Sequence, residues 1–407
     1  MKLKLTSSFG NFAALLLGVI ASLLPFPFIF QAADHITDVF INFLQLLGPP
    51  IIFLSIIATV TNMNSLSEAK VLVRKILKYT LLTTLIAATI GAGLFFFIRP
   101  AELSHAHTLI ETPTSPIITY LSFVKSIIPS NFAEAFLKDN VLGIAFIATI
   151  LGVSILQLKE TQKELLSSFF QALFQTLLKI STGIIKLLPI GVFFFSVKLG
   201  QILQQNASEM HSLLMYTICV ISANLIQGFI VLPIILKRKG ISPLKLAKAM
   251  MPALTTAFFT KSSSATLPLS LQCSKSNFKI SEKTANFSFP LCSIINMNGC
   301  AAFILITTLF VSASYGVTFS VMQILPWIFI STLAAIGNAG VPMGCYFLTS
   351  ALLVAMNVPL HVLGMILPLY AFFDMVETCL NVWSDSSITA IVDKEIKESQ
   401  AEPVQAT

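Results

Sequence analysis

Charged side chains are scarce in this chain, and basic ones are missing from a stretch of its last third. Only 11% of its 407 residues are charged and 55% are hydrophobic. No Lys or Arg occurs between Lys283 and Lys394. Because soluble domains carry about 25% charged residues, this composition excludes an ordinary soluble fold. It predicts an all-α polytopic protein whose apolar segments, about 20 residues each, cross a lipid bilayer.

The sequence also lacks motifs for metal cofactors, disulfide frameworks, nucleic acid and catalysis. Its six cysteines form no C-x-x-C pair and are expected to be small packing residues. No basic cluster is interleaved with aromatic residues, which excludes nucleic acid as a partner. Ser262 beside Lys261 is a poor catalytic pair because adjacent residues rarely bring nucleophile and base together. We therefore predict that the protein is not an enzyme. The cysteines are Cys219, Cys273, Cys292, Cys300, Cys345 and Cys379.

Six apolar segments of membrane-spanning character occupy the first 240 residues. Pro49-Pro50 is expected to kink or break the second segment, and Pro189 to close the fifth. Basic residues follow the second, fourth and sixth segments, so those loops and the N-terminus are predicted to be cytoplasmic. A short amphipathic piece is expected near 130–137. The segments are 12–30, 39–60, 79–98, 141–158, 165–188 and 213–236.

After residue 240 this alternation fails, and the failure predicts re-entrant structure. The apolar stretch 249–273 has lysines on both flanks, so both flanks are expected on the cytoplasmic side. Its polar middle, 261–268, fits a hairpin tip. The span 285–311 is interrupted at 296–299, and 324–356 is interrupted at 337–344, which predicts a second hairpin of opposite orientation. The last span, 361–392, would end at a cytoplasmic C-terminus.

One face of the last span carries the polar groups of a predicted site. A carboxylate at bilayer depth costs roughly 3 kcal/mol, so these side chains should face a cavity or pathway. A proton, a metal cation or a substrate amine would neutralise the acids. Paired broken helices in opposite orientation indicate a cation-coupled carrier for a zwitterionic or anionic substrate. A protonated, packed Glu377 is the alternative. The face comprises Asp374, Glu377, Thr378, Asn381 and Asp385, at helical spacing.

Four ordered motifs resemble the dicarboxylate/amino acid:cation symporter family, which contains glutamate and neutral amino acid transporters. The similarity extends upstream through Ile128-Pro129-Ser130-Asn131 and Leu81-Leu82-Thr83-Thr84, and so covers most of the chain. Any one motif alone would be a weak signal. The motifs are Ser262-Ser263-Ser264-Ala265-Thr266-Leu267-Pro268, Asn296-Met297-Asn298-Gly299, Ala339-Gly340-Val341-Pro342 and Asp374-x-x-x-Thr378-x-x-Asn381-x-x-x-Asp385.

The resemblance implies eight transmembrane helices plus two opposed re-entrant hairpins, built as inverted repeats in a homotrimer with an elevator movement. It implies a multi-pass protein of the cell (inner) membrane with both termini cytoplasmic. The expected divisions are 1–78 (first two spans, scaffold), 79–158 (span three, an external segment and span four), 159–240 (spans five and six), 241–393 (transport core) and 394–407 (polar tail).

Residue roles also follow from the resemblance, position by position. Asp374 would bind the substrate amine, with Thr378 beside it. Asn381 and the hairpin backbone around Ser262 and Ser263 would hold the α-carboxylate, and Val341 would close from the second hairpin. Sodium would be the coupled ion. Asp385, with backbone of Asn296 and Asn381, would form one Na⁺ site. Thr83, Thr84 and Asn296 would contribute to another, and Asn298 lies in a third cation region.

Departures from the family pattern bear on the substrate. Glu377 replaces an Arg of the acidic-substrate members, Tyr370 replaces a supporting Asp, and Cys300 replaces a Thr. These changes remove the means of holding a side-chain carboxylate. A Glu here resembles the bacterial serine/threonine symporter branch, so a small neutral amino acid is the predicted substrate.

The sequence leaves open alternatives for the substrate, the coupled ion and the class of transport protein. A cationic or an acidic (glutamate, aspartate or dicarboxylate) substrate, H⁺ coupling through Glu377 and an ion channel are the alternatives. Asn298 stands where the family has Asp, which removes a charge from the third cation region. Lys261 stands where the family often has Arg, which keeps the charge but loses the planar fork.

Overall fold

The computed structural model describes residues 2–24, 27–62, 70–100, 128–129, 131–137, 141–205, 207–317, 319–338 and 343–401. All regular elements in these ranges are helical. The first part contains α1 (Lys2–Ser22), α2 (Pro27–Asn62), α3 (Lys70–Ile98), α5 (Phe132–Leu137), α6 (Val141–Leu156), α7 (Glu160–Lys186), α8 (Leu188–Gln205), α9 (Ala207–Ile226), the π-helix η3 (Gln227–Val231) and α10 (Leu232–Arg238).

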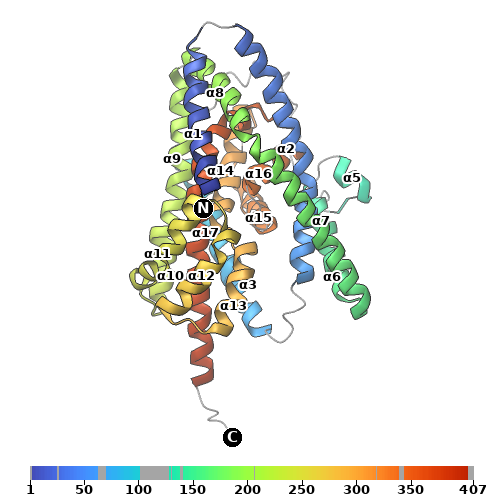
Figure 1. Cartoon of the computed structure of the whole chain (residues 1–407), viewed down its shortest axis with the longest axis vertical. Helices are drawn as coiled ribbons and strands as arrows, with labels where there is room; N and C mark the ends of the chain where they lie inside the picture. Colours follow the sequence, from blue (N-terminus) through green and yellow to red (C-terminus); the bar gives the residue numbers. More distant parts are fainter. Residues whose placement is uncertain are drawn as a thin grey trace.

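The second part contains two helix pairs of hairpin type and two longer helical units. Its elements are α11 (Pro243–Thr260), α12 (Ser263–Phe278), α13 (Glu282–Ile295), α14 (Asn298–Ser314), α15 (Val321–Gly337), α16 (Gly344–Ala355) and α17 (His361–Ala401). α11 packs against α12, and α14 packs against α15 and α16. Figure 1 shows α14 and α16 near the middle of the molecule, and α17 descending toward the C-terminus.

The first hairpin turns where the sequence is polar. Lys261 ends α11 in the left-handed conformation (φ 52°), and its N–H donates to the Ala257 carbonyl. Ser262 then caps α12 by accepting a hydrogen bond from the Ala265 N–H over 3.2 Å. A serine cap supplies a partner for a helix N–H that would otherwise have none, which starts the new helix directly. The turn thus lies within the predicted tip.

Both predicted breaks further along the chain coincide with helix ends. Asn296 ends α13, and α14 begins at Asn298 after the non-helical Met297. In the second case α15 ends at Gly337, and Met343 precedes α16 in the left-handed conformation (φ 59°). The motif residues 339–342, Val341 among them, lie outside the described residues.

Two expectations for the N-terminal part are wrong: a helix break at Pro49-Pro50 and an undivided first apolar run. α2 runs through Pro49-Pro50 without ending there. Proline is tolerated in membrane helices because neighbouring groups re-satisfy the freed backbone carbonyls. The first apolar run is divided, since α1 ends at Ser22 and α2 begins at Pro27. The fifth segment does close just before Pro189, because α7 ends at Lys186 and a new helix, α8, begins at Leu188 with Pro189 in its first turn, where a missing N–H removes no helical hydrogen bond.

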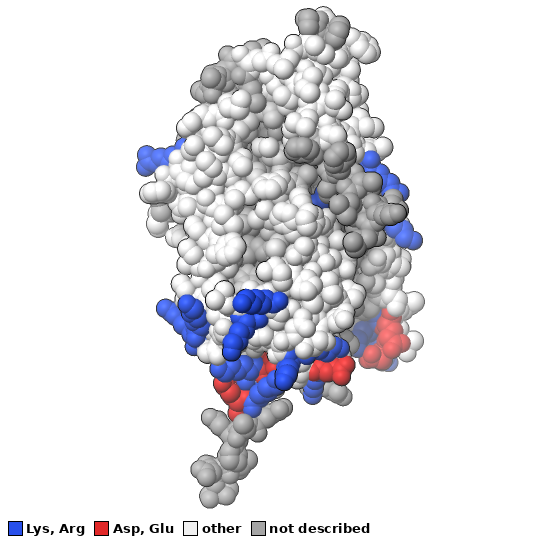
Figure 2. Space-filling model, turned by 60° about the vertical axis from the view of Figure 1, so that its left-hand side comes forward, with Lys and Arg blue, Asp and Glu red and all other residues white. Residues whose placement is uncertain are grey.

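Four helical units in the described residues are long and apolar enough to cross a membrane: Val71–Ile98, Met210–Arg238, Glu282–Ser314 and His361–Glu398. Shorter apolar helices accompany them. Figure 2 shows Asp and Glu, with many Lys and Arg, at the lower end of the molecule, below a broad band of uncharged residues that has further basic side chains only at its two edges. This distribution is typical of a protein whose middle lies in lipid and whose end lies in water.

Ion pairs fasten the end of α17 to neighbouring helices. Glu395 contacts Lys75 Nζ and Lys239 Nζ at 2.6 Å each, and it also accepts a hydrogen bond from Tyr79. The hydrogen bond from Lys239 to Glu395 raises the pKa of this lysine. Asp393 accepts from Ser281 Oγ at 2.5 Å and pairs with Lys397 at 2.6 Å. These contacts fix the register of α17, and thus the height of its acid-lined face.

Candidate functional site

The acid-lined face of α17 lies inside the molecule. Glu377 and Asp385 are 1% and 2% exposed, and Asp374 is partly exposed. Thr378 donates a hydrogen bond from Oγ1 to Asp374 Oδ1 over 3.5 Å. Among the described residues, no Lys or Arg forms an ion pair with any of these three acids. Lys261, at the tip of the first hairpin, acts electrostatically on Asp374 without forming such an ion pair.

The broken helix α13–α14 meets this face at Asp385. Asn296 Nδ2 donates to Asp385 Oδ1 over 2.8 Å, and Ser384 Oγ donates to Asn296 Oδ1 over 3.3 Å. Both residues of the first pair are buried. An amide at this break therefore contacts the carboxylate predicted to be a sodium ligand. Ser384 was not among the predicted site residues.

A second polar cluster continues from Asn296 toward α3. Asn298 Nδ2 donates to Asn296 Oδ1 at 2.8 Å, and it also lies 3.3 Å from Thr83 Oγ1 and 3.5 Å from Thr84 Oγ1. Five of the six predicted cation residues thus form one connected network of oxygen and amide groups: Thr83, Thr84, Asn296, Asn298 and Asp385. All five are buried.

Gln227 belongs to this network and was missed by sequence reasoning. Its Nε2 donates to Asn298 Oδ1 over 2.6 Å and to the Thr83 carbonyl over 3.0 Å. The residue begins the π-helix η3, which offsets the side chains that follow it. Such single-turn π segments are frequent at functional sites. No residue pattern in the apolar run 213–236 announces one.

The start of α14 approaches α17 so closely that only glycine fits at position 299. A Cβ atom there would lie 2.8 Å from Asn224 Oδ1 and 2.9 Å from Glu377 Cα. The Gly299 N–H donates to Asn381 Oδ1 over 2.9 Å. The first turn of α14 thus reaches the middle of the acid-lined face.

A disulfide joins the two helices that border Glu377, which corrects one prediction. Cys300 of α14 and Cys345 of α16 are bonded, with their Cα atoms 5.4 Å apart. The expectation that these two cysteines are only packing residues is therefore wrong. Their separation of 45 residues in sequence hid the pairing, since only the return of the second hairpin brings them together. Cys219, Cys273, Cys292 and Cys379 are free.

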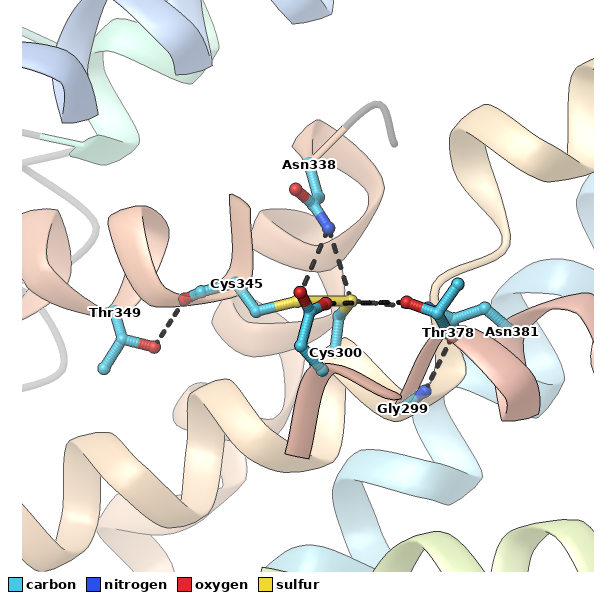
Figure 3. The surroundings of a disulfide bond; sticks show 8 residues. Gly299, Cys300, Asn338, Cys345, Thr349, Thr378 and Asn381 are labelled. Atoms are coloured by element: carbon cyan, nitrogen blue, oxygen red, sulfur yellow. Dashed lines mark hydrogen bonds between the residues drawn. A yellow bond between two sulfur atoms is a disulfide. The ribbon is translucent and has the colours of Figure 1, made fainter. Parts of the chain in front are cut away.

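Asn338, at the end of α15, faces this sulfur pair. Its Nδ2 donates to Cys300 Sγ over 3.3 Å and to Cys345 Sγ over 3.4 Å. Asn381 Nδ2 lies 3.5 Å from Cys300 Sγ on the other side. Figure 3 shows both amides directed at the sulfur atoms, with Thr378 next to Asn381 on α17. Asn338 was not predicted as a site residue.

The remaining predicted substrate residues come from the first hairpin and the second hairpin tip. Ser263 is buried, and the side chain of Ser262 is used as the cap of α12. α12 packs against α17, so the two helices belong to one packed unit. Val341 lies outside the described residues.

In chemical terms, the region combines two kinds of group. One is the buried oxygen-rich network around Asp385 and Asn298, and hard cations prefer such oxygen ligands. The other is the face of Asp374, Glu377, Thr378 and Asn381, which offers carboxylates and a hydroxyl to an amine. A cation and an ammonium group would together supply positive charge to acids with which no Lys or Arg of the described residues forms an ion pair.

The chain is similar to known membrane transporters over most of its length. The family model described as "Sodium:dicarboxylate symporter family" matches residues 9–395. A Caenorhabditis elegans protein named as a candidate sodium-dependent excitatory amino acid transporter, glt-4, is 28% identical over 88% of this chain and 81% of its own length.

Relatives with different named substrates occur among the matches. The bovine "Neutral amino acid transporter B(0)" is 28% identical over 76% of this chain and 64% of its own length. The bovine "Excitatory amino acid transporter 3" is 26% identical over 88% of this chain and 78% of its own length. Likeness at this level leaves the substrate class to the site residues.

Proposed function

Because the chain belongs to the sodium:dicarboxylate symporter family, a family of membrane transporters and not of enzymes, we propose that it carries a small neutral amino acid, such as serine or threonine, into the cell together with Na⁺. The observation that carries this proposal is the burial of the Glu377 carboxylate without a hydrogen-bond partner. Its carboxylate is buried, and neither oxygen has a hydrogen-bond partner in the described part of the chain.

A carboxylate in that position disfavours an acidic substrate. Glu377 lies one helical turn from Asp374 on the same face of α17. A glutamate or aspartate side chain bound there would bring a further negative charge, and like charges at such a site cost several kcal/mol. The ring centroid of Tyr370 lies 5.0 Å from that of Phe303 and 5.1 Å from that of Tyr346, so this neighbour of the site offers an aromatic cluster in place of an acid.

Substrate recognition would use both charges of the amino acid. We assign the amine to Asp374, with Thr378 beside it, because a partly exposed carboxylate that forms no ion pair in the described residues can form a charge-assisted hydrogen bond with an ammonium group. The α-carboxylate would be held by Asn381 and by backbone N–H groups at the start of α12, around Ser262 and Ser263, since helix N-termini favour anions. Val341 would close over the substrate from the second hairpin, and Cys300 would border it.

Sodium coupling would use the buried network described above. Asp385, Asn296 and Asn381 would form one Na⁺ site, and Thr83, Thr84, Asn296 and Asn298 would contribute to another. Burial of a carboxylate without a basic neighbour favours a state in which a cation occupies the site. Substrate and ion would then stabilise each other, because α14 and α17 bear groups for both.

A cationic amino acid is the second candidate, and it rests on the same unpartnered carboxylate. An arginine or lysine substrate would place its side-chain cation against Glu377 while its amine contacts Asp374.

The proposed function also includes a homotrimer with an elevator movement and a cytoplasmic location for both termini. In that arrangement, α11 to α17 would form the moving core.

Uptake into proteoliposomes under an inward Na⁺ gradient tests the proposal. Radiolabelled serine, glutamate and arginine would be compared, with and without the gradient, and with unlabelled serine inside for counterflow. We expect saturable, Na⁺-driven serine uptake that shows counterflow. Glutamate uptake of equal efficiency would contradict the assignment of Glu377, arginine uptake would favour the second candidate, and a non-saturating conductance would point to a channel.

A further inference from the structure

The Cys300–Cys345 pair and Glu377 form a cluster that sodium coupling does not use. The two cysteine sulfurs and one carboxylate oxygen of Glu377 all lie within 4.8 Å of one another. The three residues are buried and come from α14, α16 and α17. We propose that the dithiol form of this pair, together with Glu377, binds a single thiophilic divalent cation of the Zn²⁺ or Cd²⁺ class.

The geometry suits such an ion. Zn²⁺ binds sulfur at about 2.3 Å and carboxylate oxygen at about 2.0–2.2 Å, so neighbouring ligands of a tetrahedral ion are ~3.5–4 Å apart. Ligand atoms already within 4.8 Å of one another need only small side-chain rotations to reach a common ion. Two sulfurs and one oxygen leave a fourth position for water.

The unpartnered carboxylate of Glu377 is a second, independent indication of a bound cation. Both oxygens of Glu377 are buried without a hydrogen-bond partner in the described residues, although buried polar atoms are nearly always paired. The Gly299 backbone, which packs against Glu377 Cα, holds this side chain beside the sulfurs. A bound cation would satisfy the oxygens and accept their charge.

The surrounding amides fit thiolate ligands. Asn338 Nδ2 lies within hydrogen-bond distance of both sulfurs, and Asn381 Nδ2 is near Cys300 Sγ. Amide donors of this kind stabilise metal-bound thiolates and orient them. Thiolates select soft or borderline ions over Na⁺, Mg²⁺ and Ca²⁺, so the cluster would be distinct in chemistry from the oxygen network at Asp385.

Access to the site depends on the oxidation state of the cysteines. A phosphine reductant breaks the sulfur–sulfur bond with one water, yielding two thiols and the phosphine oxide. Binding of the ion then displaces one proton from each thiol. In the disulfide form the sulfurs carry no charge and Glu377 alone is left, which is too few ligands for tight binding.

An ion at this position would tie the second hairpin, α15–α16, to α14 and α17. If the proposed transport function holds, and the hairpin moves during transport, the ion would inhibit uptake by holding the hairpin in place. That consequence rests on the proposed function, whereas metal binding itself does not.

Equilibrium binding on purified protein in lipid nanodiscs tests the site without any transport assay. The protein would be reduced with the phosphine, desalted without oxygen, equilibrated with Cd²⁺ and separated from free ion, and its bound cadmium would be counted. We expect one ion per chain with cadmium–thiolate ultraviolet absorption after reduction, and no bound ion after oxidation with diamide.

Two variants and one control locate the ion. Cys345→Ser, which leaves one thiol, should at least halve the thiolate absorption per bound ion and weaken binding by ~100-fold or more. Glu377→Gln, which keeps both thiols, should weaken binding ~10-fold or more. Cys219→Ala removes a buried cysteine outside the cluster and should change nothing. Equal binding in the oxidised protein, or full binding in both cluster variants, would overturn the proposal. A failure of serine uptake would leave these results unaffected, so the two proposals fail independently.

Discussion

Asn296 Nδ2 and Asp385 Oδ1 lie 2.8 Å apart, which joins the break between α13 and α14 to the middle of α17. This contact holds an unwound segment against a buried acid that lacks a basic partner in the described residues. In our account, Na⁺ binds beside this pair and thereby couples the broken helix to the substrate face four residues earlier on α17.

Asp385→Asn should impair sodium coupling while the fold persists. The variant keeps a polar group of the same size but loses the charge that attracts the ion. We expect the Na⁺ concentration for half-maximal uptake to rise about tenfold or more, which corresponds to ~1.4 kcal/mol. Glu282→Gln, on an exposed surface residue, is the matched control. An unchanged Na⁺ titration in Asp385→Asn would remove this residue from the ion site.

Asn298→Asp should make the protein more dependent on sodium. Asn298 Nδ2 now donates to Asn296 Oδ1 at 2.8 Å, and a carboxylate would face that oxygen as a second acceptor. Loss of a buried hydrogen bond of this kind costs about 1–3 kcal/mol without a compensating cation. Thermal unfolding should show a lower melting temperature than the parent at low Na⁺ and a larger rise on adding Na⁺. An equal Na⁺ response would count against a cation at this position.

Asp374→Ala should abolish substrate binding with the fold intact. The carboxylate is the assigned partner of the amine, and loss of a charge-assisted hydrogen bond costs about 1.5–3 kcal/mol or more when the other charge stays buried. Serine-dependent thermal stabilisation in the presence of Na⁺ measures this directly. The Na⁺-dependent stabilisation should remain in the variant. Retained saturable serine binding would show that the amine lies elsewhere.

Gly299→Ala should destabilise the protein, because the new methyl group would overlap Asn224 Oδ1 and Glu377 Cα. Overpacking of this kind costs about 1–3 kcal/mol. Gly93→Ala on α3 is the matched control, since a Cβ there meets nothing within 4 Å and alanine favours helix by about 1 kcal/mol. The two melting temperatures should move in opposite directions. A neutral Gly299→Ala would mean that α14 and α17 separate easily at this point.

The breaks and hairpin turns were predictable from sequence because each depends on local chemistry. A polar serine-rich stretch between apolar runs and Asn-Met-Asn-Gly inside one are local turn signals, and helices of the structure end at both. The acids of α17 were predictable as an inward face because carboxylates at that depth are costly and follow helical spacing.

Other features depend on contacts that no local pattern encodes. Cys300 and Cys345 meet only because α16 returns to α14, and Gln227 joins the cation network only because η3 adds an extra residue to a helical turn. The continuity of α2 through Pro49-Pro50 likewise reflects packing by neighbouring helices. Local sequence rules overestimated the effect of these prolines. They gave no signal for the Cys300–Cys345 pair or for the place of Gln227.

The change in substrate preference caused by Glu377→Arg is the measurement that most directly tests the central claim. That claim is that residue 377 selects a small neutral substrate. Uptake of serine and glutamate would be compared in proteoliposomes containing the parent or the variant, under the same Na⁺ gradient. We predict that the variant loses serine preference and gains Na⁺-driven glutamate uptake, because a guanidinium would pair with the substrate's side-chain carboxylate. Unchanged serine preference in a folded, Na⁺-responsive variant would contradict the account.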